Sequence, residues 1–421
     1  MTESHAQLPT ELAPLAATPA QFHQLADALV AGHGPFAIDT ERASRFRYDD
    51  RAYLIQIHRA GAGTFLFDPE GGRDALTAAL SPVLNGQDWV LHAAPSDLPC
   101  LAWMGLYPGT VFDTELAARL IGHSRPSLAH ITEEFVGVHL DKGFGDADWS
   151  ARPIPEEQLL YARQDVDLLL ELADELRGHL VNDDKQSWAE EEFALIVAGH
   201  ADITEPAPAE WRDLRGLPTL RSRRQLNVAR ALWNHRDEQA RSTDTPPGWI
   251  MSNKVLLEVA RQLPTTPHAL GRIRGFPRRR HNATLEWMQV LDEAYALDPS
   301  WWPEFVRSRS PYPSKNTMSR TYPELWEKYK KLQEDIHALA AEIQVNDDVF
   351  ITNSTVRHAV WSALATDEMI AENASLATDN MPDIVLINEP DNIPEFLRTQ
   401  GAREWQIELA TPVFAEFFFP A

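Results

Sequence analysis

The chain has 421 residues, 44% of them hydrophobic, and a formal net charge of −24 from 38 basic and 62 acidic residues. This length exceeds one ordinary hydrophobic core and favours two or three domains, while the charge of the whole chain argues against a polyanionic partner. The single cysteine, Cys100, excludes an intramolecular disulfide. With neither an apolar run of about 18 residues nor a signal-peptide pattern, we expect a cytoplasmic protein without a membrane span.

The first half of the chain mixes helical and strand patterns. Residues 1–17 are expected to form a flexible segment, and Thr18 with Pro19 predicts a helix that runs to about Ala31 and ends at Gly32. Further patterns predict strands at 35–41, 52–58, 64–69 and 89–93, and helices at 73–84, 96–105, 114–122 and 155–180. Three leading strands followed by alternating helix and strand predict an α/β domain whose mixed sheet is flanked by helices.

Two acids stand one residue apart at the end of the first of these strands. Asp39 and Glu41 in "FAIDTE" point to the same face, because side chains alternate along a strand. Two carboxylates beside a core repel each other, at a cost of several kcal/mol, unless a cation lies between them. The pair is therefore either a loop-edge Asp with a solvated Glu or part of a divalent metal site, and the choice depends on further carboxylates.

Further carboxylates follow at two positions. Asp97 lies at the start of a predicted helix, five residues after His92 at a strand end, and Asp at such a position is commonly an N-cap. Tyr161 and Asp165 are spaced i and i+4, which places both side chains on one face of a helix. Taken alone, Asp165 is as readily a solvated edge residue as a ligand.

Together, the four acids and the tyrosine match the order and local contexts of the DEDDy 3′–5′ exonucleases, and the first half of the chain resembles ribonuclease D. The likeness extends to "FDTELAARL" at 112–120 and "DWSARPIP" at 148–155. It implies a ribonuclease-H-like exonuclease domain over 18–202, in which two divalent ions, Mg²⁺ or Mn²⁺, are bound by Asp39, Glu41, Asp97 and Asp165, with Asp39 bridging both. Oxygen ligands suit these ions. A free tyrosine is a poor base, so the resemblance implies that Tyr161 orients the attacking water.

Other residues near these motifs have a functional and a structural interpretation. His92 is either a substrate contact or a hydrogen-bonded core histidine, and Lys142 is either a phosphate ligand or a solvated loop lysine. Asp113 is expected to cap the helix that Thr114 opens. Trp149 is expected to pack its loop, and Cys100 to be buried and inert.

The second half of the chain is predicted to be helical. Residues 203–210 are Pro- and Ala-rich and indicate a linker, while residues 211–288 carry 15 Lys and Arg against 6 Asp and Glu. The Arg-rich module over 211–295 resembles an HRDC domain. A Pro-rich linker at 296–320 is expected to precede a second HRDC-like helical domain at 321–421. The two modules share a pattern in which a long helix meets a polar turn, a short apolar segment, and then Ser-Asn or Thr-Asn opening another helix.

The arginines of the basic module fall into two clusters, and arginine forks suit phosphate oxygens. The alternative is that they pair with the acidic nuclease half and hold the domains together. The candidate nucleic-acid-binding residues are His92, Lys142, Arg221, Arg223, Arg224, Arg272, Arg274, Arg278, Arg279 and Arg280.

These features predict a metal-dependent exoribonuclease that removes nucleotides from RNA 3′ ends, with tRNA precursors as the implied substrates. Two alternatives remain open: the same enzyme acting on DNA, and a non-catalytic nucleic-acid binder that kept the fold. No G-x-x-x-x-G-K-[ST] loop occurs, so ATP is not expected. The sequence does not fix the oligomeric state, although a monomer is favoured.

Overall fold

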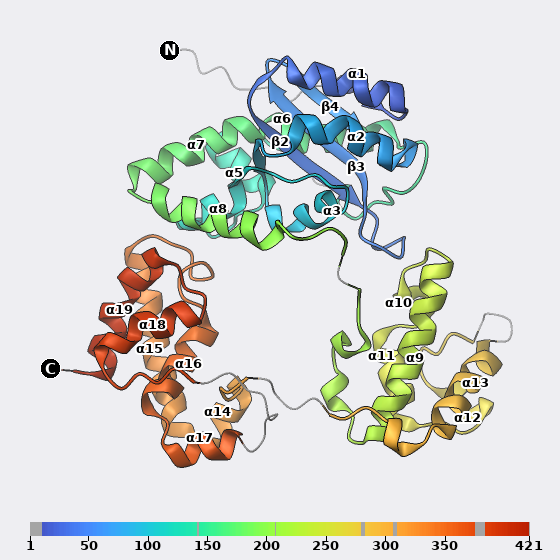
Figure 1. Cartoon of the computed structure of the whole chain (residues 1–421), viewed down its shortest axis with the longest axis vertical. Coiled ribbons are helices and arrows are strands. Elements are labelled where there is room, and N and C mark those ends of the chain that lie inside the picture. The colour runs from blue at the N-terminus through green and yellow to red at the C-terminus, as the bar shows by residue number, and fades with distance from the viewer. Residues whose placement is uncertain are drawn as a thin grey trace.

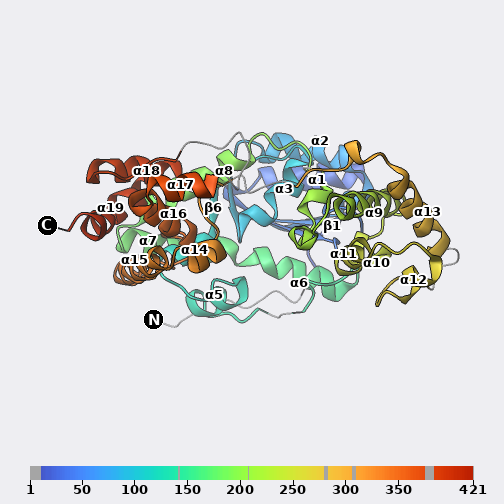
Figure 2. The same cartoon turned by 90° about the horizontal axis from the view of Figure 1, so that it is seen from below.

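The computed structural model describes residues 11–140, 143–206, 208–278, 283–305, 310–374 and 384–420. An N-terminal α/β domain is followed by two helical modules, which lie below the α/β domain in Figure 1 and at its two sides in Figure 2. The expected order of an α/β domain with a mixed sheet and two all-α regions is confirmed. None of the described helices combines the length and apolarity needed to cross a bilayer.

The described residues of the α/β domain form one six-stranded mixed sheet in the order β1-β4-β3-β2-β5-β6. Strand β3 pairs with β2 and with β4, and both pairings are antiparallel. The pairings of β1 with β4, of β2 with β5, and of β5 with β6 are parallel. The strands are β1 (Leu15–Ala16), β2 (His33–Arg42), β3 (Ala52–Ala60), β4 (Gly63–Phe67), β5 (Asp88–Leu91) and β6 (Thr110–Asp113).

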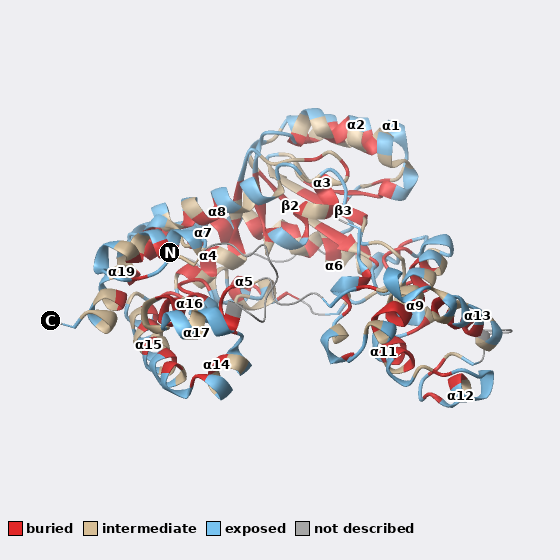
Figure 3. Ribbon diagram, turned by 60° about the horizontal axis from the view of Figure 1, so that its bottom comes forward, coloured by how far each residue is buried: buried red, intermediate tan, exposed pale blue. Residues whose placement is uncertain are grey.

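Strand alternation sets which residues of β2 face which layer. Phe36 and Ile38 are buried in the core that the sheet shares with α1 (Pro19–Val30), α2 (Arg73–Leu84) and α3 (Leu98–Ala102). Ala37 belongs instead to the core beneath α7 (Leu169–Asn182). Asp39 and Glu41 share the face of Ala37, because side chains two residues apart point the same way. Figure 3 shows the buried stretch along β2 and β3.

Several expected elements differ from the structure. Residues 15 and 16, expected to be flexible, form the edge strand β1, which pairs with Leu66 and Phe67 of β4. The helix expected over 155–180 is two helices, α6 (Glu156–Asp167) and α7, with Leu168 between them at φ −106° and ψ 2°. Asp167 at the end of α6 accepts hydrogen bonds from Thr64 of β4 and from Arg163, which ties the end of α6 to the sheet, and α7 then packs against β2 and β5.

The remaining helices and 3₁₀ turns lie along the rest of the chain. The α/β domain also contains α4 (Thr114–Leu120), α5 (Leu128–Phe135), α8 (Gln186–His200), η1 (Pro69–Gly71) and η2 (Ala94–Ser96). The middle module contains η3 (Trp211–Asp213), η4 (Leu217–Thr219), α9 (Arg223–Ser242), α10 (Pro247–Ile250), α11 (Asn253–Gln262), α12 (Pro267–Arg272), α13 (Ala283–Ala296) and η5 (Pro299–Trp301). The last module contains α14 (Lys315–Thr321), α15 (Pro323–Glu342), α16 (Asn353–Leu364), α17 (Asp367–Ala374), η6 (Pro390–Asn392), α18 (Ile393–Thr399) and α19 (Glu404–Phe418).

The two helical modules do share the local structure that the sequence pattern indicates. Their long helices α9 and α15 each have 20 residues. A left-handed residue follows each helix, Asp244 with φ 46° and Gln344 with φ 52°. Ser252 and Thr352 then cap α11 and α16 through their side-chain oxygens. The pattern therefore marks the same sequence of helix, corner and capped helix in both modules.

The two modules are attached to the α/β domain in different ways. The last module continues the apolar core of the α/β domain, so that Leu176 and Phe193 belong to the same buried cluster as Tyr329, Trp361 and Phe414. Polar contacts reinforce this junction, including Lys185 Nζ donating to the Gln344 carbonyl at 2.8 Å.

The middle module has its own core around α9 and α11. It joins the α/β domain through polar contacts of the loop that follows β2. There the hydroxyl of Tyr48 donates to Asp237 at 2.9 Å, and the backbone N–H of Tyr48 donates to Asp244 at 3.1 Å.

Candidate active site

The acid pair lies on the face of β2 that α6 covers. The register places Gln56 of β3 opposite Asp39, and Gln56 Nε2 donates to Asp39 Oδ2 at 3.2 Å. Glu41 is buried and Asp39 is half-buried. The solvated-edge interpretation of the pair is therefore wrong for Glu41.

Helix α6 brings Tyr161 and Asp165 to the same place. The helix packs on β2, β3 and β4, and its i, i+4 spacing places both side chains over the carboxyl end of β2. Carboxylate oxygens of Asp39, Glu41 and Asp165 all lie within 4.8 Å of one another. Three of the four predicted acids thus form one compact oxygen cluster.

The fourth acid, Asp97, borders this cluster from the turn between β5 and α3. Its carboxylate accepts a hydrogen bond from Thr40 Oγ1 at 2.6 Å and lies 4.0 Å from Arg42 NH2. The side chain makes no N-cap hydrogen bond to α3, so the capping alternative is wrong. The negative charge of Asp97 raises the pKa values of Asp39 and Glu41, which places it among the same group of acids.

Burial raises the pKa of every acid in this group. Burial is the first cause and neighbouring carboxylates add to it: the pKa of Glu41 rises to about 9, that of Asp165 to about 7 and that of Asp97 to about 6. The pKa of Asp39 also rises, for the same two reasons. Four crowded acids without a compensating cation are poorly stable as anions, and an all-oxygen donor set suits a hard divalent cation. The donor set therefore fits Mg²⁺ or Mn²⁺.

Arg42, which follows Glu41 directly, is a residue that the sequence reasoning missed. Its guanidinium donates to the carbonyl of Ser96 and forms ion pairs with Asp97 and with Asp50 at 3.5 Å. The charge of Arg42 lowers the pKa values of Asp39, Glu41 and Asp97. The available signal was a basic residue directly after the acid pair, although no spacing rule shows which way its side chain turns.

Tyr161 is held in place by aromatic packing and by Asp165. The rings of Phe144 and Trp149 lie 5.7 Å and 6.4 Å from that of Tyr161, and the hydroxyl of Tyr161 hydrogen-bonds to Asp165. Burial, followed by the neighbouring acids, raises the pKa of the Tyr161 hydroxyl above its ordinary value of 10. A hydroxyl that ionises less readily than free tyrosine suits a hydrogen-bonding role.

A strained turn positions the segment that carries Asp97. Ala93 follows β5 in the left-handed region at φ 57°, and its N–H and that of Ala94 donate to Asp113 at 3.1 and 2.8 Å. Asp113 also accepts from the N–H groups of Glu115 and Leu116 at the start of α4, so the predicted cap is confirmed. One buried carboxylate thus fixes both the turn and the helix.

His92 sits beside this turn with a structural hydrogen bond. Its Nδ1 lies 3.0 Å from Thr114 Oγ1, whose own hydrogen is donated to the Leu91 carbonyl. Burial lowers the pKa of His92 to about 4, so its ring is neutral near pH 7. Trp149 and Cys100 are buried, as expected. Lys142 lies outside the described residues.

The candidate arginines of the middle module have different surroundings. Arg223 donates to the carbonyls of Pro299 and Trp302 and pairs with Glu304 at 3.0 Å, so it holds its own module together. Arg224 lies over the ring of Tyr295 at 4.8 Å. Exposed side chains are those of Arg221, Arg224, Arg272, Arg274 and Arg278, whereas Arg279 and Arg280 lie outside the described residues.

The ion pairs between the α/β domain and the middle module are formed by other arginines. Arg47 and Arg51 of the α/β domain pair with Asp244 at 3.4 and 3.8 Å. Arg241 NH2 lies 3.2 Å from the Tyr48 hydroxyl, which it contacts across the same boundary. Among the described residues, neither Arg223 nor Arg224 takes part in these contacts between the α/β domain and the middle module.

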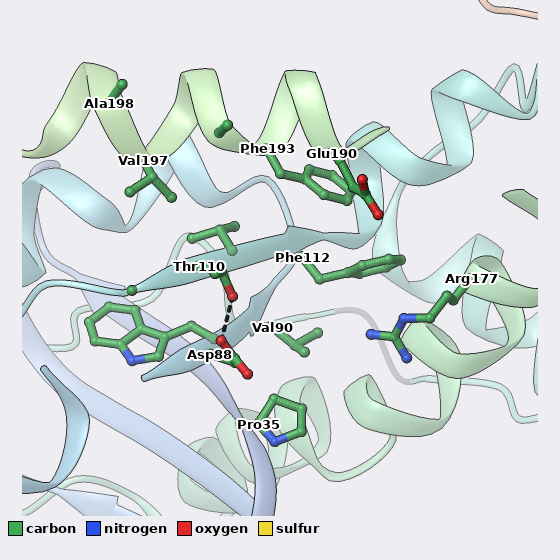
Figure 4. Close-up of a pocket in the computed structure, with 14 residues that line it drawn as sticks. Pro35, Asp88, Val90, Thr110, Phe112, Arg177, Glu190, Phe193, Val197 and Ala198 are labelled. Carbon is green, nitrogen blue, oxygen red and sulfur yellow. Dashed lines mark hydrogen bonds between the residues drawn. The ribbon is translucent and has the colours of Figure 1, made fainter. Parts of the chain in front are cut away.

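A cavity of about 610 Å³ lies away from the acid cluster. Pro35, Asp88 and Thr110 line it at the beginnings of β2, β5 and β6, so it opens at the opposite end of these parallel strands from Asp39. Figure 4 shows Phe112, Arg177 and Phe193 around it, and the 2.7 Å hydrogen bond from Thr110 to Asp88. Its apolar lining and its position separate this cavity from the candidate active site.

A second group of metal-ligand types, His123, His130 and Glu134, is explained without an ion. The N–H of Arg125 donates to Nδ1 of His123, which leaves the hydrogen on Nε2. That Nε2 then donates to Glu134 at 2.6 Å. The His123–Glu134 hydrogen bond accounts for this contact.

Comparison with protein families gives three matches along the chain. Residues 16–180 match the family described as 3′-5′ exonuclease, residues 225–290 match the HRDC domain, and residues 311–418 match the 3′ to 5′ exonuclease C-terminal domain. The first match contains the four acids and Tyr161. The third covers the last helical module, which had been expected to be HRDC-like.

Curated relatives carry the name ribonuclease D. The protein of Gluconacetobacter diazotrophicus is 31% identical over 249 residues, which is 58% of this chain and 62%, or less than two thirds, of that relative. The protein of Xanthomonas oryzae pv. oryzae is 32% identical over 254 residues, covering 59% of this chain and 68% of the relative.

Among solved structures, a protein from Bifidobacterium adolescentis matches nearly the whole chain. The TM-score is 0.79 with 29% identity, and the match covers 98% of each chain. The three modules therefore recur in the same order in a solved structure. From the family matches and the identity to named members, the chain belongs to the ribonuclease D family.

Proposed function

We propose that this chain is a metal-dependent 3′–5′ exoribonuclease that hydrolyses phosphodiester bonds one nucleotide at a time from RNA 3′ ends. The observation that supports the proposal best is the oxygen cluster of Asp39, Glu41 and Asp165 with Asp97 at its border. These groups converge from β2, α6 and the turn after β5, and together they make a site of concentrated negative charge. Such a site binds cations, and a phosphodiester reaches it only together with them.

Asp39, Glu41, Asp97 and Asp165 are the residues that would hold two divalent ions. Bound ions of this kind supply charge stabilisation for the attacking and leaving oxygens of the phosphodiester. The protein contributes the placement of these ligands: Gln56 fixes Asp39, while Thr40 and Arg42 fix Asp97. Arg42 also carries positive charge to the side of the site where Asp97 lies.

Tyr161 is proposed to orient the attacking water by a hydrogen bond from or to its hydroxyl. Its ring packs against those of Phe144 and Trp149, and this packing positions the hydroxyl at the edge of the acid cluster. The raised pKa of Tyr161 keeps this hydroxyl protonated across the physiological range. Positioning is therefore a better role for Tyr161 than general base catalysis.

RNA as the substrate is proposed from the relatives' name, ribonuclease D. The basic middle module, with 15 Lys and Arg against 6 Asp and Glu over 211–288, would supply the attraction for phosphates that the acidic remainder lacks. We extend the proposal to tRNA precursors as substrates, Mg²⁺ or Mn²⁺ as the ions, and a monomer in the cytoplasm.

A direct assay tests this proposal. The protein is incubated with 5′-labelled RNA and with DNA of the same sequence, each with a free or a blocked 3′ end, in Mg²⁺, in Mn²⁺ or in EDTA. We expect a ladder that shortens from free RNA 3′ ends only, and none in EDTA. Equal degradation of DNA would favour the alternative substrate. Binding without cleavage under every condition would leave a non-catalytic binder and contradict the proposal.

A further inference from the structure

An exposed tryptophan of the middle module meets a phenylalanine of the α/β domain. Trp249 in α10 is 67% exposed. Its ring centroid lies 6.2 Å from that of Phe46, with the two planes at 75°. Phe46 belongs to loop 43–51, which continues from β2. Single exposed apolar residues are common, but here two aromatic rings from different modules meet and much of the indole remains open to solvent.

This aromatic pair lies next to the candidate active site. Phe46 follows Glu41 by five residues, so their Cα atoms lie no more than about 18 Å apart. Arg45 pairs with Asp146 at 2.9 Å, and Arg47 Nε donates to Ser150 at 2.7 Å. These contacts join loop 43–51 to the segment that carries Phe144 and Trp149, the residues that pack against Tyr161. The pair thus borders the same loops as the tyrosine of the site.

The polar contacts of the module boundary fix Trp249 with respect to Phe46. Asp244 accepts the N–H of Tyr48, and α10 begins only three residues after Asp244. The Tyr48 hydroxyl donates to Asp237, and Arg241 holds the same hydroxyl from the side. Because Tyr48 is two residues from Phe46, these bonds hold the segment that carries Phe46 against the module that carries Trp249.

We propose that Phe46 and Trp249 form a stacking subsite for a base of the single-stranded 3′ segment, a few nucleotides before the bond that is cut. This inference rests on the proposed function, since it assumes that the 3′ end reaches the acid cluster. Every base has an apolar π-face, so stacking on an exposed indole binds single strands with little sequence preference. Trp249 belongs to the basic module and Phe46 follows the strand that carries Asp39 and Glu41, so the pair joins the module expected to attract phosphates to the segment that leads to the acids.

The test compares Trp249→Ala with a matched control, Trp301→Ala, which removes another exposed indole of the same module, 72% exposed, at η5. Affinity for RNA is measured by fluorescence anisotropy in Mg²⁺, for a dinucleotide and for a strand of about ten nucleotides, each with a non-hydrolysable analogue in place of its 3′-terminal phosphodiester. We expect Trp249→Ala to weaken binding of the longer strand about tenfold and to leave binding of the dinucleotide unchanged. Trp301→Ala should change neither.

Two further variants separate stacking from a general disturbance. Trp249→Phe should restore most of the lost affinity, because it keeps an aromatic face. Tyr48→Phe removes the hydroxyl contacts to Asp237 and Arg241 and should weaken binding of the longer strand by a smaller factor, with the melting temperature nearly unchanged. Unchanged binding of the longer strand by Trp249→Ala, or equal losses for both probes, would overturn the inference. Absence of nuclease activity in the wild type would be a separate failure, that of the proposed function.

Discussion

At the residue scale, the acids of the site are held in an arrangement that is unfavourable without cations. Burial first, and neighbouring carboxylates second, raise the pKa values of Glu41, Asp97 and Asp165 to about 9, 6 and 7. The native state therefore binds these protons more tightly than the unfolded chain. A carboxyl whose folded pKa is raised contributes stability that is present at low pH and is lost as pH rises toward that folded pKa.

This predicts how the melting temperature of the metal-free protein depends on pH. In EDTA, it should fall from about pH 4, where these carboxyls ionise in the unfolded chain, to about pH 9, where the last of the three ionises in the native state. Mg²⁺ or Mn²⁺ should raise the melting temperature more at the upper end of this range, because the ions bind the ionised acids. The matched variant Asp165→Asn should show a smaller fall. Equal falls in the wild type and in Asp165→Asn would contradict the assignment of the effect to the cluster.

A second prediction at this scale concerns Tyr161. Tyr161→Phe keeps the ring that packs on Phe144 and removes only the hydroxyl, so folding and metal affinity should hold. The single-turnover rate of hydrolysis should drop by about 10²–10⁴-fold, as when a group that positions or transfers a proton is removed. A rate equal to that of the wild type would exclude Tyr161 from the reaction.

At the element scale, the turn after β5 depends on one buried carboxylate. Asp113 accepts four backbone N–H groups, from Ala93, Ala94, Glu115 and Leu116. Asp113→Asn replaces one oxygen by an NH₂ group that cannot accept, so we expect a loss of about 1–3 kcal/mol in the free energy of unfolding. Asp88→Asn, at an exposed carboxylate that accepts from Thr110, is the matched control and should have little effect. Equal stability of both variants by denaturant unfolding would show that Asp113 does not fix the turn.

The elements also show how far local sequence rules reach. The helix at Pro19–Val30 was predictable because Thr18 caps it and Pro19 opens it, and the strands around Asp39 were predictable from their apolar patterns. Strand β1 was not, since two residues carry no periodicity and pair with β4 across 51 positions of sequence. The break at Leu168 was also hidden, because no Gly or Pro marks it and the neighbouring Asp167 bonds Thr64, a residue distant in sequence.

The candidate site shows the same division. Strand and helix spacing predicts that Asp39 and Glu41 share a face and that Tyr161 and Asp165 share another, and the two faces meet. The direction of the Asp97 carboxylate, toward Thr40 and Arg42, depends on a left-handed turn at Ala93 that no sequence rule signals for an alanine. The role of Arg42 was missed because its contacts with Ser96 and Asp97 join segments that are distant in sequence.

At the scale of the whole molecule, charge is divided between the modules. The α/β domain and the last module share one apolar core, whereas the middle module keeps its own core and carries the positive charge. Because the rest of the chain is acidic, the basic middle module is the region best suited to binding a polyanion such as RNA. The contribution of that region should appear as a dependence of RNA affinity on salt.

The prediction concerns Arg278, Arg279 and Arg280, of which only Arg278 lies within the described residues. Replacing all three with Ala should weaken RNA binding and flatten the slope of log K against log salt by up to about 2, at about 0.7 per phosphate contact on a single strand. The charge-matched control is the replacement of Lys328, Lys330 and Lys331 of α15 with Ala, which should alter the slope less. Identical slopes for the wild type and the arginine variant would place these arginines away from RNA.

The central claim, that the four acids bind the ions on which hydrolysis depends, is tested most directly by RNA hydrolysis under single-turnover conditions. The measurement compares the wild type with Asp39→Asn, Glu41→Gln, Asp97→Asn and Asp165→Asn, alongside their metal-free melting temperatures. We predict that hydrolysis is abolished in each variant while the melting temperature holds or rises, because neutralising one acid relieves repulsion among the others. Hydrolysis that survived in any two variants, or melting temperatures that collapsed in all four, would contradict the assignment.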